Sequence, residues 1–280
     1  MNTLALNMVL QDAENRLSLA GISDARSEAR LLLELAGLPR HQQVTDPFRT
    51  LPEPIAGKFS IMLTRRLRRE PFSHLRGVKE FWSREFIVTE HVLAPRPDSE
   101  TLIEALRDHR PDRDATYAFL DFGTGSGCLL VTALAEYPLS HGLGLDLDPR
   151  ALCCARENAR RLGIGPRAAF VCGHWADALT GAYDVILANP PYVALRDRLP
   201  PEVALYEPSR ALFGGRDGLD CYRALLPALG TLLKPRGLVF LEIGCDQAET
   251  VQTLAQRVGL RVRECRRDLA GRDRCLVLAP

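Results

Sequence analysis

Four residues at the end of an apolar run combine polar acceptors, an aromatic ring and a stiff backbone. Asn189-Pro190-Pro191-Tyr192 directly follows the apolar run 183–188. The two prolines lack N–H groups and fix φ at about −65°, so the chain cannot continue there as a paired strand. Asn189 carries an acceptor oxygen and a donor NH₂ group on a short stem. Such a corner is suited to holding a planar NH₂ group, on either an amide or an amino base.

A second candidate site is a glycine-rich turn earlier in the chain. The apolar run 118–122 leads into Gly123-Thr124-Gly125-Ser126-Gly127, and a helical stretch follows. Glycines at alternate positions allow a ligand to approach the backbone beside a helix N-terminus. The dinucleotide fingerprint would require a glycine at the position of Cys128, which weakens the case for a nicotinamide cofactor.

An aspartate ends the next apolar segment. Asp146 follows Leu143-Gly144-Leu145, at the distance of about 20 residues where an acidic side chain accepts from the hydroxyls of a ribose. The alternative is that Asp146 caps a helix starting at Pro149. Because the glycine turn, Asp146 and the Asn-Pro-Pro-Tyr motif each follow a predicted strand, together they indicate a nucleoside-containing ligand beside a held NH₂ group.

Composition is typical of a globular protein. The 280 residues are 46% hydrophobic and 25% charged, with a net charge of +1, so no global polycation exists to hold nucleic acid. No secretory signal and no apolar run of about 18 residues is visible, so we expect no membrane partner. The eight cysteines contain no C-x-x-C pair, and we expect reduced thiols, a cytoplasmic protein and no metal site.

The hydrophobic pattern changes character along the chain. Helical spacing predicts helices from Leu6 to before Gly21, over Asp24–Ala36, and from Pro54 to Leu67. From 117 onward strands and helices alternate, which predicts a mainly parallel sheet with helices on both faces. The expected strands are 117–122, 142–147, 167–172, 183–188, 237–243, 260–265 and 274–279, and the expected helices between them are 127–136, 149–162, 218–233 and 247–258.

These patterns predict an α/β protein with three parts. We expect a helical domain over 1–72, a β-hairpin linker over 73–95 and a catalytic domain over 96–280. Asp98 or Ser99 is expected to cap the helix that begins the third part. The basic run 65–69 is either a solvated helix face or a contact for an acidic partner surface.

Two motifs resemble the class I S-adenosylmethionine-dependent methyltransferases: DFGTGSG at 121–127 and LDLDP at 145–149. The chain resembles one family more closely, the release factor glutamine methyltransferases of the HemK/PrmC type. That likeness covers roughly residues 70–280, and the helical front matches the family's architecture more loosely. Its motifs are Ala94-Pro95-Arg96-Pro97-Asp98-Ser99-Glu100, Asn189-Pro190-Pro191-Tyr192, Tyr206-Glu207-Pro208 with Ala211-Leu212, and the run from Asp268 to Arg274.

The resemblance implies a Rossmann-like class I methyltransferase domain and a specific reaction. The methyl group of S-adenosyl-L-methionine would pass to the side-chain amide nitrogen (N5) of the glutamine in the Gly-Gly-Gln loop of class I peptide chain release factors, leaving S-adenosyl-L-homocysteine and modulating translation termination. We expect a monomer without stable nucleic-acid binding.

The same resemblance assigns site residues. It places the cofactor's methionine and ribose against Gly123, Thr124, Gly125, Ser126 and Gly127, its ribose on Asp146, its adenine against Trp175, and its methyl group beside Asn189. Relatives often carry an acidic residue before that tryptophan, where this chain has His174. Either His174 or backbone would then accept from the adenine amino group.

The motif Asn189 to Tyr192 would hold the substrate glutamine. We expect the side-chain oxygen of Asn189 and the carbonyl of Pro190 to accept the two amide N–H groups, and Tyr192 to pack against the amide plane; these three are the predicted catalytic residues, and Pro191 completes the substrate site. An amide nitrogen is a poor nucleophile, so geometry is the main requirement and no general base is needed before transfer.

Other functions remain open from the sequence. One is glutamine methylation of a ribosomal protein; another is adenine-N6 methylation of DNA, because the same motif can hold the amino group of a flipped base. The small net charge and the absence of a large recognition domain count against DNA. A non-catalytic binding module is a third alternative. From its position and charge, the helical front is expected to dock a protein substrate.

Overall fold

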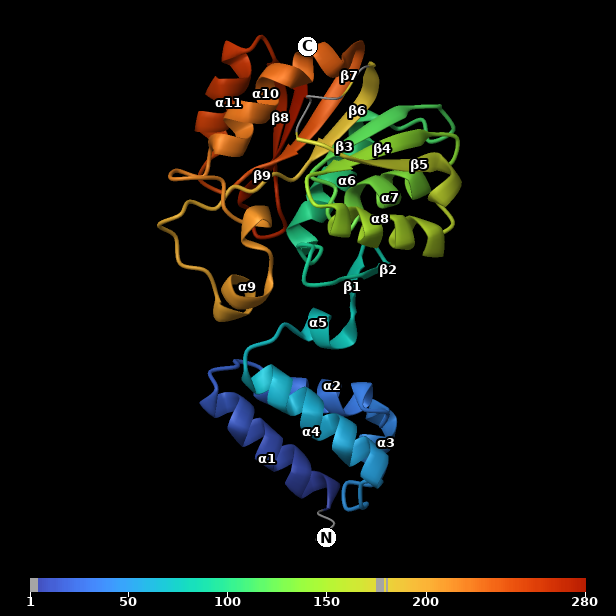
Figure 1. Ribbon diagram of the computed structural model, residues 1–280, viewed down its shortest axis with the longest axis vertical. Coiled ribbons are helices and arrows are strands. Elements are labelled where there is room, and N and C mark those ends of the chain that lie inside the picture. Colours follow the sequence, from blue (N-terminus) through green and yellow to red (C-terminus); the bar gives the residue numbers. More distant parts are fainter. Residues whose placement is uncertain (1–4, 175–178, 180) are drawn as a thin grey trace. The chain divides into compact units, whose positions relative to one another are not determined.

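The computed structural model describes residues 5–174, 179 and 181–280. The chain forms two compact units (Figure 1). The first comprises Met1–Gly77 and Pro200–Tyr206, and the second comprises Val78–Leu199 and Glu207–Pro280. Across the described residues, no helix has the length and apolar character needed to cross a membrane.

The first unit is a helical bundle. Its helices are α1 (Leu6–Leu19), α2 (Ala25–Leu35), α3 (Arg40–Thr45), α4 (Glu53–Leu67), α5 (Phe72–Arg76) and α9 (Pro201–Tyr206). Leu6, Leu17, Leu32, Phe59 and Leu63 recur at helical spacing and form its buried core. The three predicted helices are confirmed. The short helices α3 and α5 were not predicted, because each spans too few residues to display a periodic pattern.

The basic run 65–69 is largely paired inside this unit, and so it is not a simple solvated face. Three of its arginines contact carboxylates of the unit: Arg65 pairs with Glu70, Arg66 with Glu28, and Arg69 with Glu202. Glu202 lies on α9, and its Oε1 is 2.9 Å from Nη2 of Arg69. These ion pairs attach the distant segment Pro200–Tyr206 to the N-terminal helices.

Arg66 is the most buried member of that run, at 5% exposure. Replacing it by alanine leaves Glu28 without its cation, while Glu202 loses one of two and keeps Arg69. Because both carboxylates are partly exposed, we expect a loss of about 2–3 kcal/mol in the free energy of unfolding, somewhat below the cost of breaking a fully buried pair. Urea titration followed by circular dichroism measures it. Arg68→Ala, an exposed neighbour, is the control; equal losses in the two variants would contradict the assignment.

The second unit is built on a seven-stranded sheet. The strand order is β5-β4-β3-β6-β7-β9-β8, and among the described strands only β9 runs antiparallel to its neighbours. The strands are β3 (Ala118–Phe122), β4 (His141–Asp146), β5 (Ala168–Cys172), β6 (Tyr183–Ala188), β7 (Leu233–Glu242), β8 (Arg261–Arg267) and β9 (Asp273–Ala279). All seven predicted strands and the predicted α/β fold class are confirmed.

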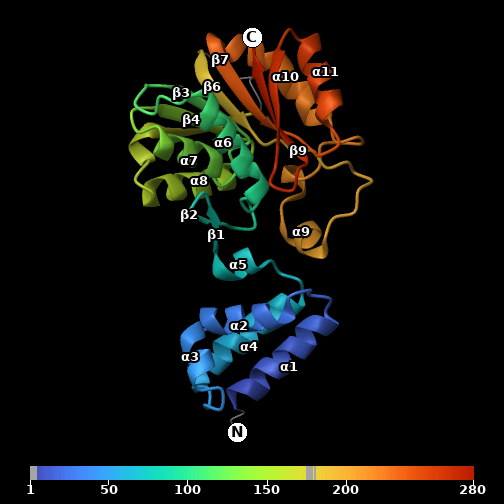
Figure 2. The same cartoon turned by 180° about the vertical axis from the view of Figure 1, so that it is seen from behind.

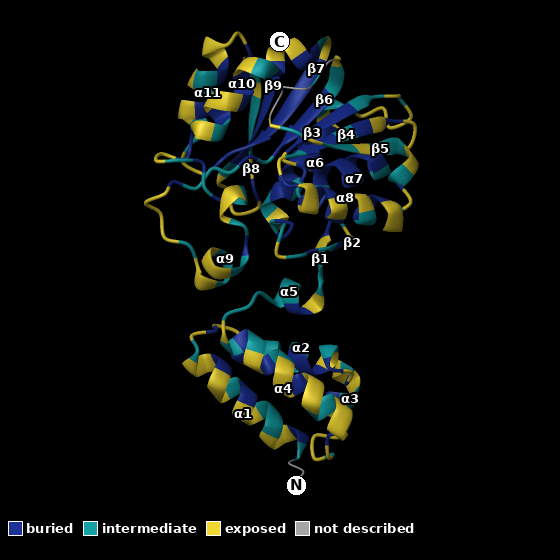
Figure 3. Cartoon of the chain, in the orientation of Figure 1, coloured by how far each residue is buried: buried dark blue, intermediate teal, exposed yellow. Residues whose placement is uncertain are grey.

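Helices cover both faces of this sheet (Figures 1 and 2). One face carries α6 (Glu100–His109), α7 (Cys128–Glu136) and α8 (Pro149–Arg161), and the other carries α10 (Asp220–Leu232) and α11 (Ala248–Arg257). Successive strand residues point to opposite faces, so Phe119 and Val185 enter one core while Leu120 and Ile186 enter the other. Both sides of the central strands are therefore buried (Figure 3).

A β-hairpin of β1 (Val78–Phe81) and β2 (Arg84–Ile87) begins the second unit. It was predicted as part of a separate linker over 73–95. Asn158 of α8 holds it: its Oδ1 accepts from the N–H of Ile87 at 2.7 Å, and its Nδ2 donates to the carbonyls of Ile87 and Ser126. The division into units thus differs from the predicted boundaries, with the first unit reaching Gly77 and including Pro200–Tyr206.

Candidate functional site

Strand register brings the predicted site residues to one edge of the sheet. Phe122 of β3 pairs with Leu145 of β4 on one side and with Ala188 of β6 on the other, and Ala188 pairs with Leu241 of β7. The next residues along these four parallel strands are Gly123, Asp146, Asn189 and Glu242. The strand order reverses between β3 and β6, which is where open α/β sheets bind ligands.

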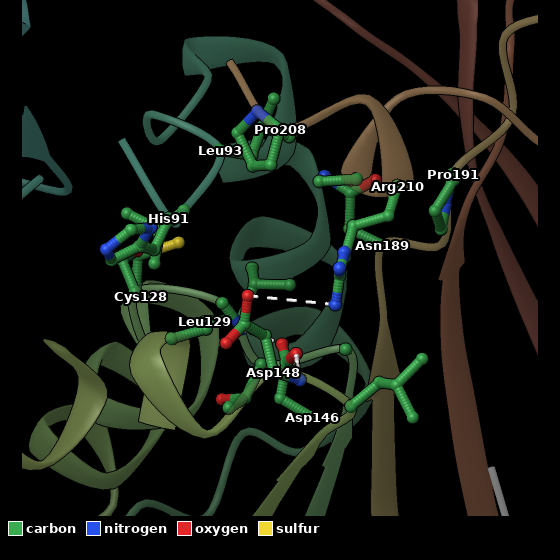
Figure 4. A pocket seen from close by; sticks show the side chains of 18 of the residues that line it. His91, Leu93, Cys128, Leu129, Asp146, Asp148, Asn189, Pro191, Pro208 and Arg210 are labelled. Atoms are coloured by element: carbon green, nitrogen blue, oxygen red, sulfur yellow. Dashed lines mark hydrogen bonds and ion pairs between the residues drawn. The ribbon is translucent and has the colours of Figure 1, made fainter. Parts of the chain in front are cut away.

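A cavity of about 310 Å³ opens at this edge (Figure 4), within the size range of small-ligand sites. The predicted residues that line it are Gly123, Thr124, Gly125, Ser126, Asp146, Asn189 and Pro191. Gly127, Pro190 and Tyr192 do not line it. The wall is completed by residues that the sequence analysis gave no role, including His91, Cys128 and Asp148.

The glycine turn combines an open surface with a firm base. Gly123 has φ +66°, and a Cβ built on it would meet no protein atom within 4 Å, so its backbone faces the open cavity. Beneath the turn, Thr124 Oγ1 donates to Oδ2 of the buried Asp121 at 2.6 Å. Burial raises the pKa of Asp121 to about 7. Gly127 is the residue preceding α7, and its missing Cβ allows close packing against Ala155 of α8.

Asp146 is fixed by backbone donors. Its Oδ2 accepts from the N–H of Gly125 and its Oδ1 from the N–H of Asp148, both at 2.9 Å. Burial raises the pKa of Asp146, and these two N–H groups oppose that shift. The alternative helix-cap role is wrong, because the cap of α8 is Asp148, which accepts from the N–H of Arg150. Each oxygen of Asp146 retains a lone pair for a ligand hydroxyl.

These features fit S-adenosylmethionine. The turn offers an open backbone edge at the start of α7, and Asp146 offers two acceptors for a ribose. Gly173 and His174 line the cavity further along, where the adenine would lie. Trp175, predicted to contact the adenine, lies outside the described residues.

Asn189 has a defined orientation. Its Nδ2 donates to Oγ of Ser99 at 3.1 Å, which directs the NH₂ group toward Ser99 and leaves Oδ1 for a ligand. Ser99 Oγ in turn donates to Oε2 of Glu242 at 2.5 Å. Ser99 occupies the N-cap position of α6, as predicted, but its side chain makes no capping hydrogen bond; it also ends the short helix η1 (Pro97–Ser99). The Ser99 hydroxyl instead bonds Glu242 and Asn189, which are distant in the sequence.

The side chain of Tyr192 points into the protein. Its hydroxyl lies 3.2 Å from Oε1 of Glu242 and 3.4 Å from Nη1 of Arg274, and burial raises its pKa. Gln247 holds the backbone by donating from Nε2 to the carbonyl of Tyr192 at 3.0 Å. Gly218, at φ +77°, passes so close to that carbonyl that a Cβ there would lie 2.2 Å from it. The end of the Asn-Pro-Pro-Tyr motif is therefore held by contacts to both its side chain and its backbone.

Sequence reasoning missed Glu242 and Arg274 as parts of the site. Glu242 is 1% exposed and ends β7, and Arg274 is 5% exposed on the adjacent β9. A carboxylate at the end of the apolar run 238–243 was the available signal, since charged groups in such positions are rarely buried without a partner.

The segment after the Asn-Pro-Pro-Tyr motif returns to the cavity. Glu207 pairs with Arg96, and Pro208, Arg210 and Ala211 line the wall. Figure 4 shows Arg210 directed at Asp148 across the cavity, with 3.7 Å between Nη1 and Oδ2. The segment that follows Tyr206 therefore forms part of the cavity wall.

Comparisons with known proteins agree with this geometry. Residues 8–77 match the PrmC N-terminal domain, and residues 97–200 match the methyltransferase small domain. The release factor glutamine methyltransferase of Caulobacter vibrioides is 41% identical, over 98% of this chain and 96% of its own length. The one from Rhodospirillum rubrum is 40% identical, over 99% and 85%.

Structural similarity extends to more distant methyltransferases. A methyltransferase from Pyrococcus furiosus superposes with a TM-score of 0.55 at 17% identity, covering 77% of this chain and 97% of its own. This match supports the fold alone. With the full-length similarity above, the chain belongs to the release factor glutamine methyltransferase family.

Proposed function

We propose that this enzyme transfers a methyl group from S-adenosylmethionine to the side-chain amide nitrogen of the glutamine in the Gly-Gly-Gln loop of class I release factors. The observation that carries the proposal is the orientation of Asn189, whose NH₂ group is committed to Ser99 so that its oxygen is available beside the cavity. An exposed acceptor at this point suits a substrate NH₂ group. Family membership then favours a glutamine amide over a nucleic-acid base.

The protein's part in the reaction is to hold the amide. Asn189 Oδ1 and the carbonyl of Pro190 would each accept one N–H of the substrate, and Tyr192 and Pro191 would bound its plane. When bound, S-adenosylmethionine supplies an electrophilic methyl group on a sulfonium; Gly123 to Gly127 and Asp146 would hold it. Fixing both reactants in line removes several kcal/mol from the barrier.

The two acceptors also stabilise the transition state. Positive charge develops on the amide nitrogen during transfer, and oxygen dipoles already aimed at that nitrogen need no reorganisation. The nitrogen loses its extra proton after transfer, so no side chain has to act as a base beforehand. Asn189 and Pro190 are thus proposed as positioning and electrostatic groups at the amide nitrogen, and Tyr192 as a packing group beside the amide plane.

The proposal is tested by incubating the purified enzyme with S-adenosylmethionine and a class I release factor, followed by peptide mass spectrometry. We expect one added methyl group, located by fragmentation on the glutamine of the Gly-Gly-Gln peptide. Parallel reactions contain ribosomal protein or duplex DNA at equal concentration. Methylation of either one, with the release factor left unmodified, would overturn the proposed substrate.

We also propose that the first unit docks the protein substrate. Support comes from the match of residues 8–77 to a domain of this family, while the paired basic run 65–69 offers little free positive charge. Docking adds binding energy outside the reacting loop, so kcat/KM for an intact release factor should exceed that for a short Gly-Gly-Gln peptide by about 100-fold. Steady-state kinetics on both substrates measure this; equal values would contradict docking.

We place the reaction in the cytoplasm and expect a monomer. Support comes from the eight free cysteines, of which Cys153, Cys172 and Cys245 are exposed; exposed thiols persist in a reducing compartment. Size-exclusion chromatography with light scattering measures the oligomeric state.

A further inference from the structure

The buried carboxyl of Glu242 contacts Tyr192 directly and Asn189 through Ser99, and so links the two ends of the Asn-Pro-Pro-Tyr motif. One oxygen of Glu242 is 2.5 Å from Ser99 Oγ, and the other is 3.2 Å from the hydroxyl of Tyr192. Ser99 is 2% exposed and Glu242 1%, so these contacts lie away from solvent. The cavity that receives the ligands is lined by Ser99 and Asn189 but not by Glu242.

The directions of these hydrogen bonds are determined by chemistry. An ionised carboxylate only accepts, so Ser99 must donate its single O–H to Glu242. The Ser99 oxygen then offers only lone pairs to Asn189, and the amide must turn its Nδ2 toward Ser99, as observed at 3.1 Å. The acceptor oxygen of Asn189 is thereby directed away from Ser99.

Arg274 donates to the Tyr192 hydroxyl and so fixes the direction of the remaining hydrogen bond to Glu242. Arg274 Nη1 lies 3.4 Å from the Tyr192 hydroxyl, and its Nη2 lies 3.2 Å from Oδ2 of Asp268. Arg274 can only donate, so the Tyr192 hydroxyl accepts from it and donates to Glu242. When Glu242 is ionised, each of these hydrogen bonds has one donor and one acceptor. We call the five linked residues the relay: Glu242, Ser99, Asn189, Tyr192 and Arg274.

We propose that Glu242, acting through Ser99, is a positioning residue that sets the amide orientation of Asn189 and so makes the site specific for an NH₂ donor. This rests on the proposed acceptor role of Asn189. If Glu242 is protonated, it can donate to Ser99, which can then donate to the Asn189 oxygen. The Asn189 amide then turns its NH₂ group toward the substrate NH₂ group, and the two donors cannot bond.

The polarity of the relay makes turnover dependent on pH. The ionisable groups that face Glu242 are Asp98, Cys128, Tyr192, Tyr222, Arg274 and Cys275. Burial raises the pKa of Glu242 to about 7, while it raises the pKa of Cys128 to about 12 and those of Cys275, Tyr192 and Tyr222 as well, which keeps them neutral near pH 7. Turnover is therefore full when Glu242 is ionised above its pKa and falls as the pH drops through it.

The first test compares two substitutions at Ser99, with a release factor and saturating S-adenosylmethionine. Ser99→Ala removes the hydroxyl and should lower kcat about 10- to 100-fold, the effect typical of outer partners of a site, with the Kd of S-adenosylmethionine unchanged within about threefold. Ser99→Thr keeps the hydroxyl and should retain most of kcat. A Ser99→Ala enzyme with wild-type kcat, or one that loses cofactor affinity by the same factor, would overturn the proposal.

The second test is the pH profile of kcat between about pH 5.5 and 8.5. Wild-type kcat should fall on the acid side, whereas Glu242→Gln cannot ionise but still offers an oxygen to Ser99, so it should keep most of kcat and lose that limb. Glu136→Gln is the control, since Glu136 is a buried carboxylate paired with Arg84 and Arg113 and should keep the wild-type profile. Asp121 is another carboxyl whose pKa burial raises to about 7, so the comparison includes Asp121→Asn: an acid limb that is lost there but kept in Glu242→Gln would overturn the proposal.

Two failures can be told apart. If the wild-type enzyme leaves the glutamine unmodified in mass spectrometry, the proposed function fails before any variant is compared. If it methylates glutamine but Ser99→Ala has the same kcat, only the relay fails. Thermal melting of each variant checks that it is folded, and the Ser99 pair decides the question if Glu242→Gln does not fold.

Discussion

Replacing Asn189 by alanine should lower kcat by about 100- to 1,000-fold, the loss typical when one preorganised polar group at a reacting centre is removed. The substitution removes the oxygen that would accept one N–H of the substrate amide, and it leaves the other acceptor, Pro190, on the backbone. Affinity for S-adenosylmethionine should change little, because the glycine turn and Asp146 lie on neighbouring strands. Single-turnover kinetics and calorimetry measure the two quantities separately.

The matched comparison for this variant is Asn189→Asp. Aspartate keeps an acceptor oxygen but cannot donate to Ser99, whose oxygen already faces Asn189 Nδ2 at 3.1 Å. We expect Asn189→Asp to lose activity as well, since a second carboxylate would stand next to the buried Glu242. Equal losses of turnover and cofactor affinity in Asn189→Ala would mean that Asn189 belongs to the cofactor site rather than to the substrate site.

Replacing Asp146 by alanine should weaken the binding of S-adenosylmethionine strongly and lower kcat only slightly, the opposite of the effect expected for Asn189→Ala. The change removes both proposed acceptors for the ribose, each a charge-assisted bond, and a net loss of roughly 2–3 kcal/mol raises the Kd of S-adenosylmethionine about 30- to 150-fold. It also frees the N–H groups of Gly125 and Asp148, which loosens the turn. At saturating cofactor, kcat should fall less than about tenfold.

Calorimetric titration with S-adenosylmethionine measures this effect, and Asp217→Asn is its control. Asp217 is an exposed carboxylate paired with Arg223 and does not line the cavity, so its substitution should leave cofactor affinity unchanged. If Asp146→Ala bound cofactor normally but turned over slowly, Asp146 would have to act at the methyl group rather than at the ribose.

Much of the catalytic fold could be predicted because its signals are local. Apolar runs bounded by glycine, proline and aspartate mark the strands, and a one-residue shift in register would turn buried side chains such as Leu120 and Phe119 to the wrong faces. Once the parallel sheet is assumed, residues that follow successive strands must meet at one edge. This is why Gly123, Asp146 and Asn189 could be grouped from the sequence.

The parts that were missed depend on contacts between distant segments. Ser99 has the residue type and position of a helix cap, but its hydroxyl is taken by Glu242, 143 residues further along. The run 65–69 has the composition of a solvated face, but Arg69 pairs with Glu202, which lies on α9. Neither partner is identifiable from spacing, because many carboxylates in the chain could satisfy an arginine or a hydroxyl.

The inclusion of Pro200–Tyr206 in the first unit has a consequence for how this protein can be cut or recombined. The chain crosses between the units three times, after Gly77, after Leu199 and after Tyr206. A gene that lacks the codons up to Gly77 would therefore encode a catalytic fragment in which α9 has lost two contacts. One is the ion pair of Glu202 with Arg69, and the other is the hydrogen bond of 2.7 Å from the Tyr206 hydroxyl to the carbonyl of Arg68. Exchange of the helical unit between relatives by a single crossover would separate α9 from its own partners, so the two segments are expected to be inherited together.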